Sequence, residues 1–454
     1  MAERIVILGG GESGTGAAIL AKAKGFDVFV SDQGQLQEKY RLDLLHHAIE
    51  FEEGKHSEDK IVSADLIVKS PGIPEKADII KKIRSKKIAV IDEIEFAFRY
   101  LKGKVIAITG TNGKTTTTLL IYHLLKAADK KVALAGNVGE SLARKVATED
   151  CDWYIVEISS FQLDGTQTFH PHIGILLNIT PDHLDRYDNR MANYVNSKFK
   201  LVKNMGSKDY FIYYVEDPIA GREARQRSTE AYRVEVSLDP EAITSAHFDG
   251  KKMVFQFGKK SFKIAQSDTT LKGTHNLINT MAAVSAAFLA KVPDSKIREA
   301  LKTFKNAPHR LESIATINGV EFVNDSKATN VDSVVYALGS YDKPLIWIAG
   351  GIDKGNDYNL IKSDVEKKVK TLICLGKDNE KLKKFFGKVV PRIVETQSVR
   401  ELVQLALQAA EKGDVVLLSP ACASFDLFKN YEDRGNQFRD QVLKLKEETE
   451  HVKA

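Results

Sequence analysis

The sequence predicts an α/β protein of three domains: a Rossmann-like domain, a central P-loop-type domain and a second Rossmann-like domain. Short apolar runs alternate with amphipathic helical patterns along most of the chain, which is typical of βαβ units and parallel sheets. The length of 454 residues also suits about three domains of ordinary size. Ligands of such sheets bind beyond the carboxyl ends of the strands, so the polar residues that follow each strand are the candidates for function.

The predicted elements divide the chain into blocks at 1–101, 102–306 and 307–454. The first block has strands at 4–8, 27–31 and 65–74, with a helix at 14–24. The central block has strands at 105–110, 152–160 and 172–180, a hairpin at 253–264 and a helix at 274–290. The third block has strands at 319–323, 344–350, 371–376 and 414–419. The stretches LKGK (101–104) and FKNAPHR (304–310) are the expected boundaries.

Composition and charge restrict the class of protein. Hydrophobic residues make up 43% of the chain and charged residues 28%, which is ordinary for a globular protein with buried cores. Lys and Arg exceed Asp and Glu by 66 − 61 = 5, which is too little to indicate nucleic acid or a membrane surface as a partner. Cys151, Cys374 and Cys422 are far apart and odd in number, which favours a reducing compartment over a disulfide framework.

Targeting signals are not recognisable in the sequence. The start, MAERIVILGGGESG, lacks the long apolar core and the cleavage site of a signal peptide. No apolar run approaches the length of a membrane span. We therefore expect a cytoplasmic protein without a membrane span.

The stretch ITGTNGKTTTT (108–118) has the pattern of a phosphate loop, but it is shorter than the usual one. Two residues separate Gly110 from Gly113, whereas the standard loop has four before Gly-Lys-Ser/Thr. A predicted strand precedes it and a predicted helix follows it, which is the context of a phosphate site. Lys114 would contact the β- and γ-phosphates, and Thr115 or Thr116 would reach Mg²⁺. The alternative is a tight turn with capping hydroxyls.

Two polar residues that follow later strands are candidates for the same site. Glu157 ends the apolar run DWYIVE, and an acid in that position of a nucleotide domain holds Mg²⁺ directly or through water. It could also be no more than the polar end of a strand. His183, in NITPDHLDRY (178–187), is a candidate ligand of a metal or substrate, although a single loop histidine is more often neither.

The first block carries GGGESG (9–14), which fits Gly-x-Gly-x-x-Gly between a strand and a helix. Asp32 follows at the end of the next strand. A dinucleotide site is the standard interpretation, but a single match is weak evidence. The same geometry would hold any diphosphate.

These motifs together resemble the Mur ligase family, which includes the folylpolyglutamate synthases. GTNGKTT (110–116), EISSFQLD (157–164), NITPDHLDRY and GTHNLINTMAA (273–283) occur in the family's order, and the resemblance covers essentially the whole chain. Three further motifs resemble the branch that joins D-glutamate to UDP-N-acetylmuramoyl-L-alanine: SPGIP (70–74), NDSKATN (324–330) and LLSPACASFDLFKNYEDRG (417–435).

The resemblance implies an ATP-dependent ligation in peptidoglycan precursor synthesis. ATP would phosphorylate the free carboxylate of UDP-N-acetylmuramoyl-L-alanine, and the amine of D-glutamate would attack the acyl phosphate to give an amide, ADP and phosphate. The three blocks would bind the UDP substrate, ATP and the amino acid in that order. We expect a monomer that uses two Mg²⁺ ions.

The resemblance also assigns residues of the central block. The loop residues Gly110, Thr111, Asn112, Gly113 and Lys114 would contact the ATP phosphates. Metal ligation would fall to Thr115, Thr116 and Glu157 at one Mg²⁺ and to His183 at the second. Lys198, in NSKFK, matches the family lysine that carries a carbamate, whereas the sequence alone favours a surface lysine. The nucleotide would also contact Asn276, Asn279 and Arg310, the two asparagines lying on one helix face.

In the third block, Asp325 would approach the ribose, Lys327 the transferred phosphate and Thr329 the incoming glutamate. D-glutamate carries two carboxylates, so its pocket needs cations and N–H or O–H donors. The family pattern gives this pocket Lys354, Ser424, Phe425 and Tyr431. A helix is expected directly after Ser424. Lys354 taken alone would be interpreted as a solvated loop lysine.

The first block would bind the UDP part of the substrate. Ser13 and Ser70 would lie near the diphosphate and Asp32 near the uracil or ribose, while Asn137 and Ser159 would face the muramoyl part. His183 is also expected to contact substrate. Two residues depart from the family pattern. Glu12 stands where many members have an apolar residue beside the uracil, and Gln33 stands where a small hydroxyl residue is common.

Two other hypotheses remain open. A folylpolyglutamate synthase would share GTNGKTT, but such enzymes begin near the phosphate loop, whereas this chain has the GGGESG block before it. A nucleotide-regulated binding protein would keep Lys114 without needing metal ligands or an acceptor pocket. For the ligase we also expect the third domain to close on the second, because water must be kept from an acyl phosphate.

Overall fold

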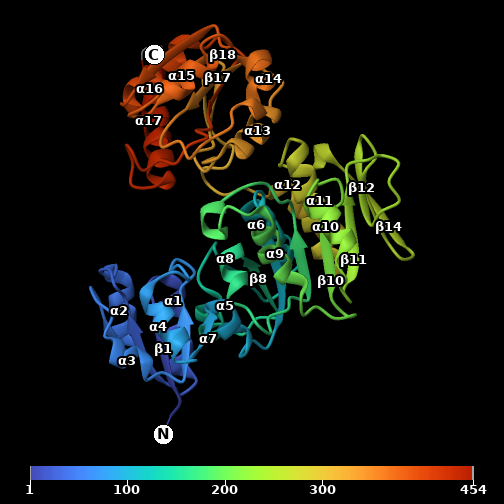
Figure 1. Ribbon diagram of the computed structural model, residues 1–454. Coiled ribbons are helices and arrows are strands. Elements are labelled where there is room, and N and C mark those ends of the chain that lie inside the picture. Colours follow the sequence, from blue (N-terminus) through green and yellow to red (C-terminus); the bar gives the residue numbers. More distant parts are fainter. Residues whose placement is uncertain (1, 452–454) are drawn as a thin grey trace. The chain divides into compact units, whose positions relative to one another are not determined.

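The computed structural model describes residues 2–451, and its contacts divide the chain into two compact units. The first unit comprises the chain up to Thr270 together with Ile278–Phe304, and the second comprises Leu271–Leu277 together with the chain from Lys305 onward. Three separate sheets lie within these units, and Figure 1 colours them blue, green to yellow, and orange to red along the sequence. The predicted fold class is confirmed.

The first sheet is parallel throughout, with the order β3-β2-β1-β4-β5. Its strands are β1 (Arg4–Leu8), β2 (Asp27–Ser31), β3 (Glu50–Glu52), β4 (Leu66–Lys69) and β5 (Ala89–Asp92). The helices that connect them are α1 (Glu12–Ala23), α2 (Glu38–His46), α3 (Glu58–Val62), α4 (Asp78–Ser85) and α5 (Glu93–Phe98). β1 is central and apolar, which is expected of a parallel strand covered on both faces.

The second sheet has the order β14-β13-β12-β11-β10-β9-β6-β8-β7, with antiparallel pairing only at β12–β13 and β13–β14. Its strands are β6 (Lys104–Thr109), β7 (Val132–Gly136), β8 (Trp153–Glu157), β9 (Ile173–Leu176), β10 (Tyr210–Tyr214), β11 (Tyr232–Ser237), β12 (Ala246–Phe248), β13 (Lys252–Phe257) and β14 (Lys260–Ala265). β6 lies between β8 and β9, so the residues that follow these three strands share one edge of the sheet.

The helical segments of this part of the chain follow the strands. They are α6 (Lys114–Ala127), α7 (Leu142–Thr148), α8 (Ser160–Asp164), η1 (Leu184–Tyr187), α9 (Met191–Phe199), η2 (Lys200–Val202), α10 (Ala220–Gln226), η3 (Gln266–Asp268), α11 (Thr274–Leu289) and α12 (Asp294–Thr303). One apolar core joins α1 and α5 to α7, which ties the first sheet's helices to the second sheet within the first unit.

The third sheet has the order β15-β16-β20-β17-β18-β19 and is parallel except for β15. Its strands are β15 (Glu312–Ile317), β16 (Val320–Asn324), β17 (Leu345–Ala349), β18 (Val369–Leu375), β19 (Arg392–Thr396) and β20 (Val415–Leu418). Its helices are α13 (Val331–Gly339), α14 (Asn359–Lys368), α15 (Glu380–Phe386), α16 (Val399–Ala409) and α17 (Tyr431–His451). Separate apolar cores cover its two faces.

Several predicted elements end earlier than expected, and the structure gives the reason. The strand predicted at 152–160 stops at Glu157 because the Ser159 side chain caps α8 in a capping box with Gln162. The strand predicted at 65–74 stops at Lys69, before the Ser-Pro-Gly turn. The helix expected after Ser424 is wrong, because residues 424–430 form turns and bends and the next helix begins at Tyr431.

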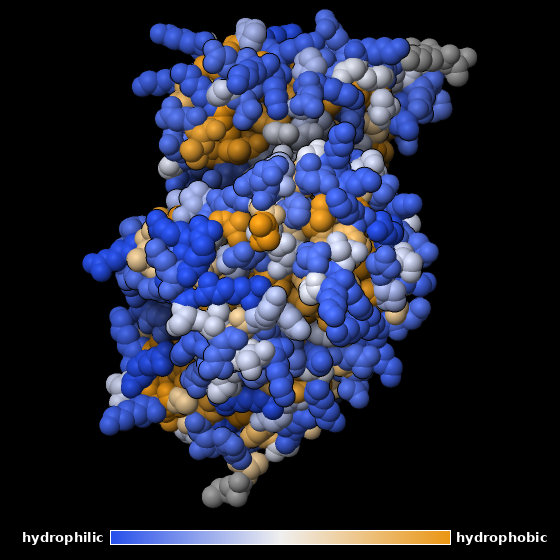
Figure 2. All heavy atoms as spheres, turned by 90° about the vertical axis from the view of Figure 1, so that its right-hand side faces the viewer, coloured by the Kyte–Doolittle hydropathy of each residue, from blue (hydrophilic) through white to orange (hydrophobic). Residues whose placement is uncertain are grey.

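The polarity of the surface is consistent with hydrophobic side chains being buried in the cores. Hydrophilic side chains cover most of the face shown in Figure 2, and hydrophobic ones occur there in small groups. Within residues 2–451, every helix is too short or too polar to cross a membrane.

Candidate active site

The contracted phosphate loop lies between β6 and α6, as the sequence predicts. Gly110 has φ +149° and Gly113 has φ +85°, conformations that side chains with a Cβ rarely adopt. Lys114 opens α6, and its Nζ donates hydrogen bonds to the carbonyl oxygens of Gly110 (2.8 Å) and Thr111 (2.9 Å). The ammonium group therefore lies over the loop, where a phosphate would need a positive charge.

The segment after β9 holds the loop in shape. The Asn112 N–H donates to Asn178 Oδ1 (2.8 Å), and Asn178 Nδ2 donates to the Asn112 carbonyl (3.0 Å). The Thr111 hydroxyl donates to the Thr180 carbonyl (3.1 Å) and accepts from the Thr180 N–H (3.0 Å). Asn178 and Thr180 were not predicted as site residues, although both stand in the motif NITPDHLDRY at the end of the strand expected at 172–180.

Lys198 is buried against the phosphate loop. Its side chain is 2% exposed, and Nζ donates to the Gly110 carbonyl at 2.9 Å and lies 4.6 Å from the centre of the Tyr194 ring. Burial, followed by the positive charge of Lys114, holds the pKa of Lys198 well below its usual value. A surface position, which the sequence alone favours, is therefore wrong, because the lysine is buried and bonded to the phosphate loop.

Glu157 ends β8 at the carboxyl edge of the sheet. Its side chain is 4% exposed, and Oε2 has no hydrogen-bond partner. A buried carboxylate oxygen without a partner is costly unless a cation or donor reaches it. Thr115 and Thr116 are buried in the first turn of α6. Among residues 2–451, no group of three or more His, Cys, Asp and Glu side chains is arranged to hold a metal, so a cation would need hydroxyl and substrate oxygens as well.

His183 lies on the segment between β9 and η1. It has φ +51°, a left-handed conformation, and its ring packs edge-on against Phe161 with centroids 5.4 Å apart. Nε2 is 3.5 Å from Asp182 Oδ2, and half of the side chain is exposed. The imidazole is therefore accessible to a ligand.

Side chains that follow β2 and β4 hold the glycine-rich loop of the first sheet. Both oxygens of Asp32 accept backbone N–H groups at 2.7 Å, from Gly10 and from Gly34. The Ser70 hydroxyl donates to the Gly9 carbonyl at 3.2 Å. Ser13 lies in the first turn of α1. Asp32 and Ser70 thus shape the loop that the sequence assigns to a diphosphate.

Two residues predicted to face the muramoyl part are anchored beside Glu157. Asn137 is exposed, and its N–H donates to the Glu157 carbonyl at 3.0 Å. Ser159 is the N-cap of α8, and its N–H donates to Gln162 Oε1 at 2.9 Å. Asn137 directly follows β7, a strand that was not predicted, and Ser159 follows β8, whereas the sequence placed Ser159 inside the strand expected at 152–160.

In the second unit, Asp325 is buried at the end of β16. Its Oδ2 accepts from the Ser419 hydroxyl (2.9 Å) and its Oδ1 from the Leu311 N–H (3.3 Å), while burial raises its pKa to about 7. Lys327 donates its N–H to the His309 carbonyl, and its ammonium group lies 5.3 Å from the centre of the Tyr431 ring. Thr329 belongs to the same turn, since its N–H donates to the Lys327 carbonyl.

The residues predicted to bind glutamate lie on two joined loops. Ile352 and Ala423 exchange backbone hydrogen bonds at 2.8 and 3.1 Å, which brings the loop of Lys354 beside the loop of Ser424. Lys354 is exposed, Ser424 is buried and Phe425 is 68% exposed.

Arg434, which the sequence analysis missed, anchors this part of the chain. Its guanidinium is buried and donates to the Ser326 carbonyl (2.8 Å), the Ser326 hydroxyl (2.9 Å) and the Cys422 carbonyl (3.3 Å). It therefore joins the NDSKATN loop to the loop that precedes Ser424. Its position in an amphipathic helix gave no signal of this role.

The remaining nucleotide candidates are divided between the units. Asn276 is buried in the second unit, where Nδ2 donates to the Lys272 carbonyl at 2.8 Å. Asn279 is buried in the first unit. Arg310 belongs to the second unit. Burial, and then the charge of Arg310, lowers the pKa of the half-buried His275 to about 4.

Comparison with known proteins agrees with this geometry. Residues 4–79 match the MurD N-terminal domain, residues 108–287 the Mur ligase middle domain, and residues 309–422 the Mur ligase glutamate ligase domain. Among solved structures, the pseudomurein peptide ligase type C of Methanothermus fervidus has a TM-score of 0.64 at 21% identity, and the UDP-N-acetylmuramate-alanine ligase MurC of Thermotoga maritima has 0.62 at 17%. Each alignment covers 98% of this chain and 100% of the other, so the fold is shared over its whole length.

Sequence relatives are closer. A protein of Cytophaga hutchinsonii is 52% identical over 98% of this chain and 100% of its own length, and one of Bacteroides fragilis is 49% identical over the same shares. Both are named UDP-N-acetylmuramoylalanine–D-glutamate ligase. The chain therefore belongs to the Mur ligase family.

Proposed function

We propose that this chain is the ligase that adds D-glutamate to UDP-N-acetylmuramoyl-L-alanine in peptidoglycan precursor synthesis, with ATP as the energy source. One observation carries the proposal. The contracted phosphate loop has Lys114 and the buried Lys198 on its carbonyls, in a chain about half identical to relatives named for this activity. We expect the protein to act as a cytoplasmic monomer.

The chemistry requires two anions to react with each other. A carboxylate is a poor electrophile, so its oxygen must first become a better leaving group by phosphorylation. The γ-phosphate and the carboxylate repel each other, and fixed positive charges reduce this repulsion. Lys114 supplies such a charge at the loop, and Lys327 is the candidate in the second unit. The amine of D-glutamate then attacks the acyl phosphate and releases phosphate.

The donor set suits magnesium. Glu157 offers a buried carboxylate oxygen without a partner, and Thr115 and Thr116 offer hydroxyl groups in the first turn of α6. Mg²⁺, when bound, would neutralise phosphate charge as the phosphoryl group moves. We assign Thr115, Thr116 and Glu157 to one ion and His183 to a second.

Lys198 suits modification by carbon dioxide. Carbamate formation requires a neutral amine, and burial beside Lys114 favours the neutral form. The modified side chain would be an anion at the loop and could orient Mg²⁺. We therefore propose that Lys198 is N6-carboxylated in the active enzyme.

The amino-acid pocket is proposed on the two joined loops of the second unit. Lys354 and the backbone N–H groups around Ser424 would bind the carboxylates of D-glutamate, with Thr329, Phe425 and Tyr431 around them. The exchange of hydrogen bonds between Ile352 and Ala423 supports a common pocket.

The test is a substrate screen with mass spectrometry and phosphate detection. Purified protein is given ATP, Mg²⁺ and UDP-N-acetylmuramoyl-L-alanine, with either enantiomer of glutamate. We expect the amide product and phosphate only with D-glutamate and only when all three substrates are present. Phosphate release without D-glutamate, or addition of L-glutamate to a folate, would refute the assignment.

A further inference from the structure

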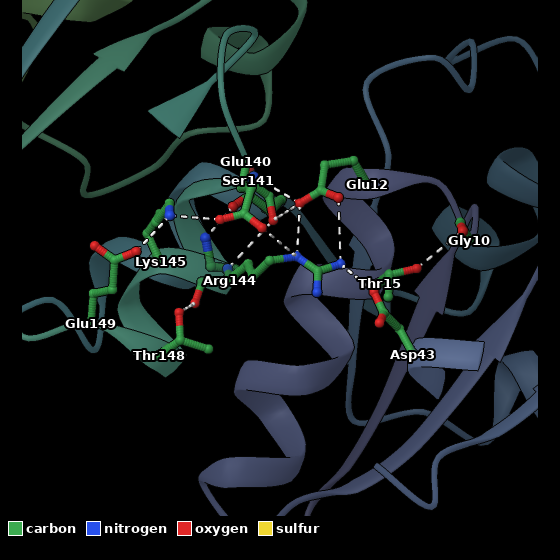
Figure 3. A network of polar contacts seen from close by, with 12 residues as sticks. Gly10, Glu12, Thr15, Asp43, Glu140, Ser141, Arg144, Lys145, Thr148 and Glu149 are labelled. Carbon is green, nitrogen blue, oxygen red and sulfur yellow. Dashed lines mark hydrogen bonds and ion pairs between the residues drawn. The ribbon is translucent and has the colours of Figure 1, made fainter. Parts of the chain in front are cut away.

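Glu12 stands in the glycine-rich loop, yet its side chain reaches the part of the chain built on the second sheet. Glu12 Oε1 accepts from the Ser141 N–H (2.9 Å), the Ser141 hydroxyl (3.0 Å) and Arg144 Nε (3.0 Å). Figure 3 shows Arg144 extending from α7 between Glu12 of α1 and Asp43 of α2. The distance from the Arg144 guanidinium to Asp43 Oδ2 is 2.9 Å.

This cluster is partly shielded from water. The Arg144 side chain is 13% exposed and that of Glu12 29% exposed. Burial lowers the pKa of Arg144, but the hydrogen bonds and charges of Glu12 and Asp43 more than compensate and raise it. Two carboxylates on helices of the first sheet, Glu12 and Asp43, thus pair with one guanidinium on α7. Because the pairs are partly shielded, solvent screening weakens their attraction less than it would at an exposed site.

The helices approach closely at the same place. A Cβ at Gly16 of α1 would lie 1.9 Å from Ser141 Oγ, so only glycine permits this packing. Glu93, at the start of α5, accepts from the Ala143 N–H at 2.5 Å. The first turn of α7 is therefore held by Glu12 and Glu93 from two sides.

The loop before α7 leads to the proposed reaction centre. The Gly136 N–H donates to the Glu140 carbonyl (2.9 Å), and the Asn137 N–H donates to the Glu157 carbonyl (3.0 Å). Residues 137–140 are thus fixed to Glu157 at one end and, through Ser141, to Glu12 at the other. This connection joins the diphosphate loop to the loop that carries Asn137.

We propose that Glu12, paired with Arg144, is a positioning residue for the UDP-linked substrate: it sets the spacing between the diphosphate loop and the Asn137 loop. The inference rests on the proposed function, since it needs the UDP substrate to contact both loops. It also accounts for an acid in a loop expected to bind a diphosphate, because the carboxylate is neutralised by Arg144 and turned toward α7.

The direction in which Glu12→Gln changes the KM for the UDP substrate distinguishes a positioning role from simple repulsion. If Glu12 were a free carboxylate near the diphosphate, Glu12→Gln would remove a repulsion and lower the KM for the UDP substrate. If Glu12 positions the loops, the same change raises that KM, because Gln keeps the shape but loses the ion pair. We expect a rise of about fivefold to tenfold, with the KM values for ATP and D-glutamate and the kcat nearly unchanged.

Arg144→Met tests the other partner, and Lys145→Met is the matched control. Lys145 is the next residue of α7 and pairs with Glu140 and Glu149, each at 2.6 Å, so its loss removes one positive charge without touching the first sheet's helices. Arg144→Met should raise the KM for the UDP substrate about tenfold, whereas Lys145→Met should leave it unchanged. The double variant Glu12→Gln/Arg144→Met should show no further rise, since both changes break the same link.

Thermal unfolding and calorimetric binding of the UDP substrate alone complete the experiment, so a folding defect is not mistaken for lost positioning. A lower KM in Glu12→Gln, equal effects of Arg144→Met and Lys145→Met, or additive effects in the double variant would each overturn the proposal. A measurement on the wild type distinguishes failure of this proposal from failure of the proposed function. If the wild-type protein does not release phosphate in a D-glutamate-dependent way, the proposed function is wrong.

Discussion

At the scale of single residues, the most informative side chains are ionisable groups buried where water would normally solvate them. Lys198 and Glu157 lie beside the phosphate loop, and Asp325 lies at the end of β16. Each would destabilise the fold if it were only structural, because burying a charge is costly. Glu157 and Asp325 lie at the carboxyl ends of strands and Lys198 of α9 lies against the phosphate loop, an arrangement that a site for charged substrates requires.

Lys198→Ala tests the role proposed for the buried lysine. We expect the ligation rate to fall by at least about a hundredfold, because the variant can form no carbamate. Short carboxylic acids such as acetate should restore part of the rate by occupying the vacated space. Lys200→Ala is the control, since Lys200 pairs with Asp164 at the surface and should be replaceable at little cost. Unchanged ligation by Lys198→Ala would contradict the assignment.

Asp92 provides a test of stability against pH. Burial raises its pKa from 3.8 to about 7, with Lys69 lowering it and Asp164 and Glu95 raising it further. Between pH 3.8 and about 7, Asp92 is protonated in the folded chain but ionised in the unfolded chain. The free energy of unfolding therefore falls as pH rises through this range. Asp92→Asn keeps the N-cap of α5 and removes this titration.

The variant should therefore be more stable than the wild type at pH 8, by on the order of 4 kcal/mol, and equal to it near pH 4. Thermal unfolding at both pH values measures the difference. A difference that is the same at both pH values would show that Asp92 does not titrate in this range.

The position of the phosphate-loop motif between a strand and a helix could be predicted because its spacing is local. Gly110, Gly113 and Lys114 form one short motif, and their chemistry follows from that motif. Glu12 and Arg434 could not be predicted, because their partners lie far away in the sequence: Glu12 contacts Ser141 and Arg434 contacts Ser326. Such contacts depend on how elements pack, which periodicity does not report.

At the scale of elements, the close packing of α1 on α7 depends on Gly16. Gly16→Ala would place a Cβ 1.9 Å from Ser141 Oγ, and the gain in helix propensity is smaller than the cost of separating the helices. We expect a loss of about 2 kcal/mol in the free energy of unfolding. Gly339→Ala is the control, because a Cβ at the last residue of α13 meets no atom within 4 Å. Equal stability of the two variants would refute this account of the packing.

Central strands were predicted most accurately. β2 and β1 match their predicted bounds, because buried parallel strands are continuous apolar runs. The edge strand β15 was missed, since its residues are mostly half-exposed and alternate weakly. The helix expected after Ser424 was wrong: the Phe428 N–H donates to the Ser424 carbonyl in a single helix-like turn, but residues 424–430 do not continue it into a helix.

At the scale of the whole molecule, the predicted contacts to ATP fall in both units, with Lys114 in the first and Asp325 and Lys327 in the second. We expect an ATP analogue together with the UDP substrate to reduce the radius of gyration measured by small-angle X-ray scattering. The UDP substrate alone serves as the control. Identical profiles with and without both ligands would contradict domain closure.

The central claim is that a phosphoryl group passes to the muramoyl carboxylate before the amide forms. The most direct measurement uses UDP-N-acetylmuramoyl-L-alanine whose carboxylate carries a heavy oxygen isotope, with ATP, Mg²⁺ and D-glutamate, and mass analysis of the released phosphate. The account predicts that one labelled oxygen appears in the phosphate for each amide formed. Amide formation with unlabelled phosphate would contradict it.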